Sequence, residues 1–255
     1  MDLNFKKLGE GTQPLIILHG LFGSSDNWLT IAKKLADDYE IFILDQRNHG
    51  DSPHNEVHTY EAMAEDLATF IEAHHIKNPY IIGHSMGGKT AMHFAVSHPD
   101  LFDKLIIVDI APRAYPVHHD QILDGLKSID LTTVKTRTDA DNQLTHYVPE
   151  LGVRQFLLKN LSRDADKKYS WKINLSVLDK SIELISKGLD EKLNAEKAVL
   201  FIGGKNSDYI SEDDYSTIDR FFPNAQIEMV AGAGHWIHAE KPAEFLGLVT
   251  NFLKK

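Results

Sequence analysis

Gly83-His84-Ser85-Met86-Gly87-Gly88 is the stretch that decides the fold of this 255-residue chain. It follows the apolar run 80–82 and opens a helical pattern over residues 85–98, which Pro99 ends. A serine between two glycines at a strand-to-helix junction is typical of a sharp turn that exposes the serine hydroxyl as a nucleophile, and the glycines leave room for its strained backbone. The other interpretation is a glycine-rich turn that packs a helix closely on a strand. The surrounding sequence decides between the two.

Short apolar runs alternate with amphipathic stretches on both sides of this turn. The runs are rich in Ile, Leu and Val, are bounded by turn residues, and suit strands that are buried on both faces of a parallel sheet. The stretches between the early runs carry apolar residues at helical spacing. The expected strands cover residues 15–18, 41–44, 80–82, 105–108, 198–202 and 226–230. This alternation predicts an α/β fold with a mostly parallel, doubly wound sheet.

The strand pattern stops between residues 113 and 195. Helical patterns take its place at residues 118–129, 139–147, 153–161 and 176–186. We therefore expect a core domain of residues 1–112 and 196–255, with a helical cap of residues 113–195 inserted after the sixth core strand. Residues 112–197 hold 14 basic and 13 acidic side chains, so the net charge of −10 belongs to the core. A nearly neutral cap would tolerate an anionic substrate.

Composition and charge exclude several classes of protein. The absence of cysteine excludes a thiol nucleophile, a cysteine-ligated zinc site, an iron–sulfur cluster and disulfides. With 27 basic against 37 acidic residues, the chain lacks the basic excess that nucleic-acid binding needs. Residues 1–7 lack a signal-peptide pattern, and no apolar run approaches the ~20 residues of a membrane-spanning helix. We expect a cytoplasmic protein with no membrane span and no nucleic-acid partner; the sequence carries no signal for its oligomeric state.

Two further segments lie where a serine nucleophile would need them. His19-Gly20-Leu21-Phe22-Gly23 follows the first expected buried strand, so the backbone N–H groups of Leu21 and Met86 are candidates for an oxyanion hole. Ala231-Gly232-Ala233-Gly234-His235-Trp236 follows the last expected strand and presents His235 as a candidate base. A lone loop histidine is most often a surface residue, but the small residues before this one favour a functional role. The chain order is then nucleophile, acid and histidine.

Four segments together resemble the α/β-hydrolase superfamily over essentially the whole chain. They are His19-Gly20-Leu21-Phe22-Gly23-Ser24, Asp45-Gln46-Arg47-Asn48-His49-Gly50-Asp51-Ser52, the turn that contains Ser85, and Gly234-His235-Trp236 with Glu240 and Pro242 after it. Within the superfamily, Arg47-Asn48-His49-Gly50 and Val108-Asp109-Ile110-Ala111-Pro112 are most similar to YbfF-type carboxylesterases. The resemblance implies an α/β-hydrolase fold and an enzyme that uses a serine, a histidine and an acid.

Two aspartates compete for the role of the acid. The superfamily usually takes the acid from the loop after the strand 198–202, but alignment of that loop puts Ser207 in the acid position and leaves Asp208 one residue out of register. Asp109 ends the strand that follows the nucleophile helix, at the sheet edge where catalytic groups of α/β folds gather. The YbfF resemblance also implies an acid there. We favour Asp109 and keep Asp208 as the alternative, with a turn-capping role as the structural explanation of Asp109.

These residues predict a serine hydrolase that cleaves carboxylic esters or acyl thioesters, with a Ser85 acyl-enzyme and His235 as general base. Phe22, His84 and Trp236 are candidate substrate-binding residues, although aromatic residues at such positions are often part of the core. A C–C bond hydrolase, a lactonase or a perhydrolase would use the same three residues, and a non-catalytic small-molecule receptor would keep the fold alone. No Gly-x-Gly-x-x-Gly, P-loop or His-Glu-x-x-His motif is present, so we expect neither a cofactor nor a metal.

Overall fold

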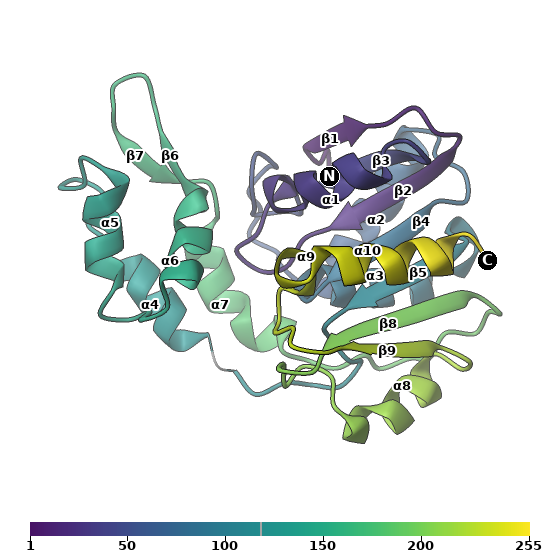
Figure 1. Ribbon diagram of the computed structural model, residues 1–255. Coiled ribbons are helices and arrows are strands. Elements are labelled where there is room, and N and C mark those ends of the chain that lie inside the picture. The colour runs from purple at the N-terminus through teal and green to yellow at the C-terminus, as the bar shows by residue number, and fades with distance from the viewer. Residues whose placement is uncertain (118) are drawn as a thin grey trace.

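In a computed structural model that describes residues 1–117 and 119–255, a seven-stranded sheet has the order β1-β3-β2-β4-β5-β8-β9 (Figure 1). Its strands are β1 Phe5–Leu8, β2 Gln13–Leu18, β3 Tyr39–Leu44, β4 Tyr80–His84, β5 Lys104–Val108, β8 Ala198–Gly204 and β9 Gln226–Val230. Strand β1 is antiparallel to β3, and the other pairs are parallel. The α/β-hydrolase fold with a mostly parallel, doubly wound sheet is thereby confirmed.

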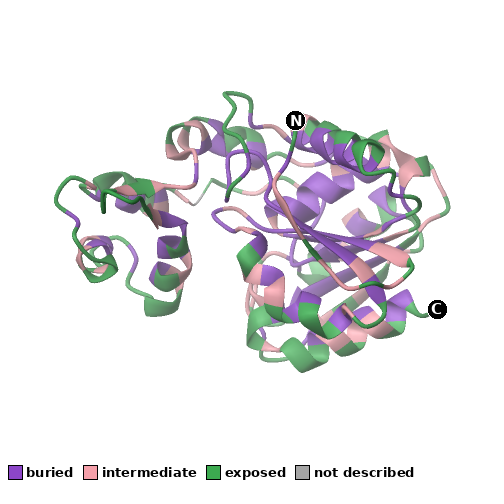
Figure 2. Cartoon of the chain, turned by 90° about the horizontal axis from the view of Figure 1, so that it is seen from above, coloured by how far each residue is buried: buried purple, intermediate pink, exposed green. Residues whose placement is uncertain are grey.

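Helices cover both faces of this sheet, which explains why its inner strands are continuously apolar. Within β2, Ile16 and Leu18 pack into one hydrophobic cluster while Leu15 and Ile17 pack into another, because successive side chains point to opposite faces. The first cluster includes residues of α2 Tyr60–Ala73, α3 Met86–Ser97 and α8 Tyr215–Phe221. The second includes residues of α1 Leu29–Leu35, α9 Ile237–Glu240 and α10 Pro242–Leu253. Figure 2 shows the buried residues concentrated along the strands and on the inner sides of these helices.

The segment of residues 113–195, here called the insertion, lies beside the sheet (Figure 1). Most of its buried apolar residues form one cluster with Phe22, Tyr60, Met63 and Met86 of the core. The elements of the insertion are α4 Asp120–Ser128, α5 Arg137–Leu144, α6 Leu151–Leu157, β6 Leu161–Arg163, β7 Tyr169–Trp171 and α7 Leu175–Ile185. The helices predicted at 139–147, 153–161 and 176–186 are confirmed with shifted ends. The helix predicted at 118–129 is present as α4, and residue 118 lies outside the described residues. The hairpin β6–β7 was not predicted, because each of its strands is only three residues long.

The position of the insertion differs from the expectation in one respect. It follows β5, so five sheet strands precede it along the described chain where we expected six. Four of these five strands were expected from buried apolar runs in the sequence, and β1 is the additional strand. It contains two lysines and lies at the edge of the sheet, so it is half-buried and lacks a continuous apolar run. The short 3₁₀ helices are η1 Ser25–Trp28, η2 Pro99–Leu101, η3 Leu158–Asn160 and η4 Glu212–Asp214. Within the described residues, no helix combines the length and apolarity needed to cross a membrane.

Candidate active site

Ser85 lies alone between β4 and α3 in a strained backbone conformation. Its φ of 53° and ψ of −116° fall outside the regions that L residues normally adopt. The turn is held by the Ser85 N–H, which donates to the carbonyl of Val108 at 3.0 Å. A Cβ at Gly83 would collide with the Gly87 carbonyl, and a Cβ at Gly87 would lie 2.5 Å from the Leu18 carbonyl. The glycines are therefore required by close backbone packing around a serine that borders a cavity.

Asp109 follows β5 and is fully buried, with a φ of 50°. One carboxylate oxygen, Oδ2, lies 2.7 Å from Nδ1 of His235, and the other accepts a hydrogen bond from the Gly204 N–H at 3.0 Å. The Ser207 hydroxyl donates to Oδ2 at 2.5 Å. Oδ1 is thus fixed by the end of β8 and Oδ2 by donors from the loops after β8 and β9, so the carboxylate has one orientation.

Asp208, the alternative acid, lies in the loop after β8 with an exposed side chain. Its backbone carbonyl accepts a hydrogen bond from Arg113 at 3.1 Å. The structure thus brings Asp109 to the imidazole of His235 and leaves the Asp208 carboxylate at the surface. Ser207 contributes a hydroxyl that we did not assign to the site, although the alignment of this loop had placed it in the acid position.

His235 lies between β9 and α9, and its ring is fixed on two sides. A carboxylate only accepts hydrogen bonds, so Nδ1 carries the proton that it shares with Asp109 and Nε2 is the nitrogen left to act as a base. Tyr209 stacks on the imidazole, with ring centroids 4.2 Å apart and planes inclined by 24°. The side chain is 19 % exposed, and both His235 and Ser85 line the same cavity.

His84 borders this cavity with a buried side chain. Its Nε2 lies 2.9 Å from the carbonyl oxygen of His235, and because a carbonyl only accepts, Nε2 carries the proton of the neutral ring. Burial, together with the neighbouring His235 and His238, holds the pKa of His84 well below its usual value. This hydrogen bond holds the backbone of His235, the candidate base, while the expected contact of His84 with substrate stays a prediction.

The loop 19–23, which carries Leu21, one of the two candidate oxyanion donors, follows β2. Phe22 has a φ of 59°, and its N–H donates to Nε2 of His49 at 3.2 Å. The Gly23 N–H donates to the Gly20 carbonyl at 2.9 Å, so both amides after Leu21 are used within the protein. Leu21 itself lines the cavity. Met86 is the first residue of α3, where backbone N–H groups have no partner within the helix.

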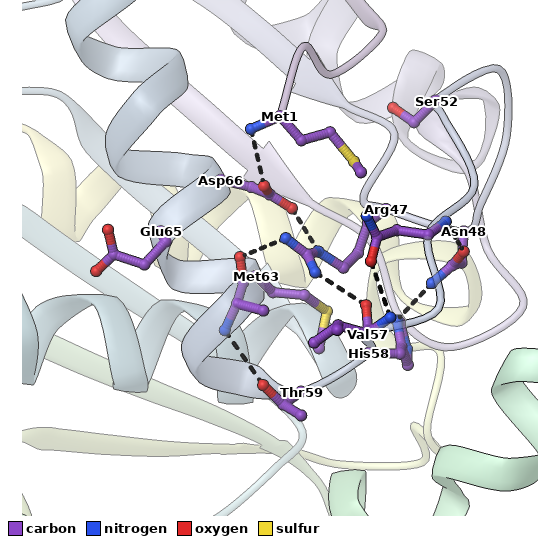
Figure 3. A network of polar contacts seen from close by, with 12 residues as sticks. Met1, Arg47, Asn48, Ser52, Val57, His58, Thr59, Met63, Glu65 and Asp66 are labelled. Atoms are coloured by element: carbon purple, nitrogen blue, oxygen red, sulfur yellow. Dashed lines mark hydrogen bonds and ion pairs between the residues drawn. The ribbon is translucent and has the colours of Figure 1, made fainter.

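A neighbouring turn, residues 45–52, holds this loop in place through hydrogen bonds to buried histidines. The Gln46 N–H donates to Nε2 of His19 at 3.0 Å, which complements the bond from Phe22 to His49. Burial lowers the pKa of His49 well below its usual value, so the ring stays neutral and can accept that bond. The turn is anchored by Arg47, whose Nε lies 2.6 Å from Asp66 and whose other nitrogens donate to backbone carbonyls (Figure 3).

The cavity has a volume of about 1110 Å³ and lies between the core and the insertion. Phe22 and Trp236 of the core line it, and the Trp236 ring lies 5.6 Å from that of Phe156 in α6. Its other apolar lining residues include Leu21, Ile122, Val153 and Leu157. Within residues 1–117 and 119–255, no group of three or more histidine, aspartate or glutamate side chains is arranged to hold a metal. The cavity thus combines Ser85 and His235 with these apolar side chains, here called the apolar wall.

This fold and this arrangement of residues define a class. The "alpha/beta hydrolase fold" family matches residues 13–242, and the chain belongs to that family. It is 41 % identical to the sn-1-specific diacylglycerol lipase ABHD11 of Danio rerio, an alignment that covers 98 % of this chain and 81 % of that one. It is 40 % identical to the esterase YbfF of Escherichia coli K12, over 94 % of this chain and 92 % of that one.

Solved structures agree with this membership. A structure described as a marine microorganism esterase superposes with a TM-score of 0.95 at 45 % identity and covers 98 % of this chain and 99 % of its own. The similarity extends through the insertion as well as the core. The chain is thus an α/β hydrolase whose relatives include proteins named esterase and lipase.

Proposed function

We propose that this protein is a serine hydrolase that cleaves carboxylic esters through an acyl-enzyme on Ser85. One observation carries the proposal: the buried Asp109 carboxylate lies 2.7 Å from Nδ1 of His235, and His235 shares a cavity with the strained Ser85. A binding protein of the same fold would not need this polar arrangement. The names of the relatives, an esterase and a diacylglycerol lipase, support ester substrates.

The proposed reaction has two steps. Nε2 of His235 takes the Ser85 hydroxyl proton while Oγ attacks the ester carbonyl, and Asp109 stabilises the imidazolium that forms. The imidazolium then protonates the leaving alcohol, which departs and leaves the acyl group on Ser85. Water, deprotonated by His235, hydrolyses this acyl-enzyme and regenerates the serine. The N–H groups of Leu21 and Met86 hold the oxyanion in both steps, and each such donor is worth about 3 to 4 kcal/mol in comparable sites.

The insertion acts in this proposal as a cap over the core domain of residues 1–112 and 196–255. Its residues Phe156 and Val153 form part of the apolar wall that would receive the acyl group. Phe22 and Trp236 complete this wall from the core. Acyl thioesters with an anionic leaving group are a second candidate substrate, because the insertion is nearly neutral and the cationic side chains of Arg113 and Lys159 line the cavity beside the acidic Glu150, Asp208 and Glu240.

The test combines labelling with a matched substrate series. A fluorophosphonate probe is expected to label the wild-type protein on Ser85 and to leave Ser85→Ala unlabelled. Hydrolysis of p-nitrophenyl acetate, octanoate and decanoate would be compared with that of the acyl-CoA thioesters of the same chain lengths. Labelling without ester or thioester turnover would favour a C–C hydrolase, lactonase or perhydrolase, and absence of labelling would favour a receptor. Either result overturns the proposal.

A further inference from the structure

Lys89 is a buried cation on the helix that begins after Ser85. Lys89 is 1 % exposed. Its backbone N–H donates to the Ser85 carbonyl at 3.0 Å, so the two residues lie one helical turn apart. The ammonium donates to three backbone carbonyls: that of Pro112 at 3.2 Å, that of Arg113 at 2.5 Å and that of Lys187 at 3.1 Å. An ammonium has three N–H donors, and here each has an acceptor.

Pro112 and Arg113 lie where the chain enters the insertion, and Lys187 follows α7, the last helix of the insertion. We call residues 112–115 the outgoing stem and residues 186–189 the returning stem. The stems pair directly, since the Tyr115 N–H donates to the Ser186 carbonyl at 2.8 Å and the Leu189 N–H to the Pro112 carbonyl at 2.7 Å. A Cβ at Gly188 would lie 2.9 Å from the Ala114 nitrogen, so a glycine permits this approach. Lys89 therefore contacts both stems where they leave and rejoin the core.

A buried charge at this position requires an explanation beyond packing. Transfer of an ammonium out of water is unfavourable unless hydrogen bonds compensate it, and an apolar side chain would fill the same space without that penalty. Burial, assisted by the nearby Arg113, lowers the pKa of Lys89 to about 7, as expected for a poorly hydrated ammonium. The Tyr115 ring lies 5.3 Å from Nζ and adds a cation–π contact from the outgoing stem. The ammonium donates hydrogen bonds to carbonyls of both stems at the same time, which an apolar side chain could not do.

We propose that Lys89 is a positioning residue that fixes both stems of the insertion to the nucleophile helix and thereby sets the distance between Ser85 and the apolar wall. The outgoing stem precedes α4, which carries Ile122 of this wall, and the returning stem follows α7, which packs in one hydrophobic cluster with Leu157 of α6. Helix α3 connects Lys89 to Ser85 through a single turn. The effect on turnover rests on the proposed hydrolase function, whereas the effect on the stems does not. Loss of the ammonium therefore loosens the stems and weakens the binding of long acyl groups, with little effect on short ones.

The experiment compares Lys89→Met with Lys104→Met. Lys104 also donates to a backbone carbonyl, that of Leu253 at 2.8 Å, but it lies at the start of β5, whereas the outgoing stem follows the end of this strand. Hydrogen exchange of peptides that cover residues 112–117 and 184–190 is expected to be about 10-fold faster in Lys89→Met, which corresponds to about 1.4 kcal/mol. In Lys89→Met, the KM for p-nitrophenyl decanoate is expected to rise about 10-fold, while kcat for p-nitrophenyl acetate stays within a factor of two of the wild-type value. Lys104→Met should change neither the exchange rates of the stems nor these kinetic parameters.

Unchanged exchange of the stems in folded Lys89→Met overturns the proposal, and so does an equal loss of activity toward acetate and decanoate. If the wild-type protein hydrolyses no ester, the function fails while the exchange measurement still tests the contact. Should Lys89→Met not fold, Gly188→Ala separates the stems without altering a buried charge. It is expected to raise the KM for decanoate in the same selective way, and an unchanged KM in that variant overturns the proposal.

Discussion

The core and the insertion meet at one cavity but are built in different ways. In the core, the carboxylate of Asp109 accepts hydrogen bonds from three partners, and both Asp109 and Ser85 have a φ near +50°. In the insertion, an apolar cluster supports Phe156 and its neighbours on the cavity wall. Proton transfer needs atoms in fixed positions, whereas an acyl group needs only an apolar surface of suitable shape. The two regions are therefore expected to respond to mutation through different kinetic parameters.

The largest effect is expected from Ser85→Ala. Removal of the attacking oxygen should lower kcat for every ester by about 10⁵-fold or more, because the remaining residues act only together with the nucleophile. The measurement is steady-state hydrolysis of p-nitrophenyl acetate, with thermal unfolding as the control for integrity. Retention of substantial turnover in pure Ser85→Ala would show that the core does not supply the nucleophile at this position.

The second prediction separates the two candidate acids within the core. Asp109→Asn should lower kcat by about 10⁴-fold, because an amide at this position no longer stabilises the imidazolium and favours the wrong tautomer of His235. Asp208→Asn should leave kcat within a factor of two, since that side chain is exposed. A larger loss in Asp208→Asn than in Asp109→Asn would reverse the assignment.

The third prediction concerns the buried neutral histidines, which belong to the core. Burial lowers the pKa of His238 to about 3 and that of His58 to about 4, from a usual value of 6.5. As the pH falls below 6.5 the unfolded chain binds these protons first, so stability is lost between pH 6.5 and the lowered pKa values. Each histidine should remove about 2 kcal/mol from the free energy of unfolding between pH 7 and pH 5.

Denaturant unfolding at the two pH values measures this loss. In the wild-type protein the rings of Trp28 and His238 stack with their centroids 4.1 Å apart. His238→Phe keeps an aromatic ring at this position without a titratable group, so the free energy of unfolding should depend less steeply on pH. His146→Gln, at an exposed position of the insertion, should leave the pH dependence unchanged. An identical pH dependence in wild type and His238→Phe would mean that His238 does not contribute to acid sensitivity.

The smallest effect is expected from the insertion. Phe156→Ala removes an aromatic ring that faces Trp236 and should weaken the binding of a decanoyl ester by about 1 to 2 kcal/mol, which raises its KM about 10-fold. The kcat for acetate should stay within a factor of two. Leu151→Ala, on the same helix but 55 % exposed, is the matched control and should change neither parameter. Equal losses toward acetate and decanoate would show that the insertion also shapes the reacting centre.

Much of the fold was predictable because its signals are local. The inner strands are short apolar runs, and the turn at Ser85 depends on residues that are adjacent in the sequence. The edge strand β1 and the hairpin β6–β7 were not predictable in this way, because half-buried or three-residue strands have no clear periodicity. The contributions of Ser207 and Lys89 were also missed, because their partners are distant in the chain. Asp109 is 98 residues from Ser207, and Lys187 is 98 residues from Lys89.

The sequence by itself determined the α/β class, the strand-to-helix turn at Ser85, the histidine after the last strand and the presence of a helical insertion. It left Asp109 and Asp208 as competing acids, because a carboxylate at the end of a strand and one in a loop are equivalent until their distances to the histidine are known. Only the tertiary structure decided which of them contacts His235 and which residues hold the loop 19–23 in place. The physical reason is that hydrogen bonds act over about 3 Å, and such proximity between distant segments arises only when the sheet assembles.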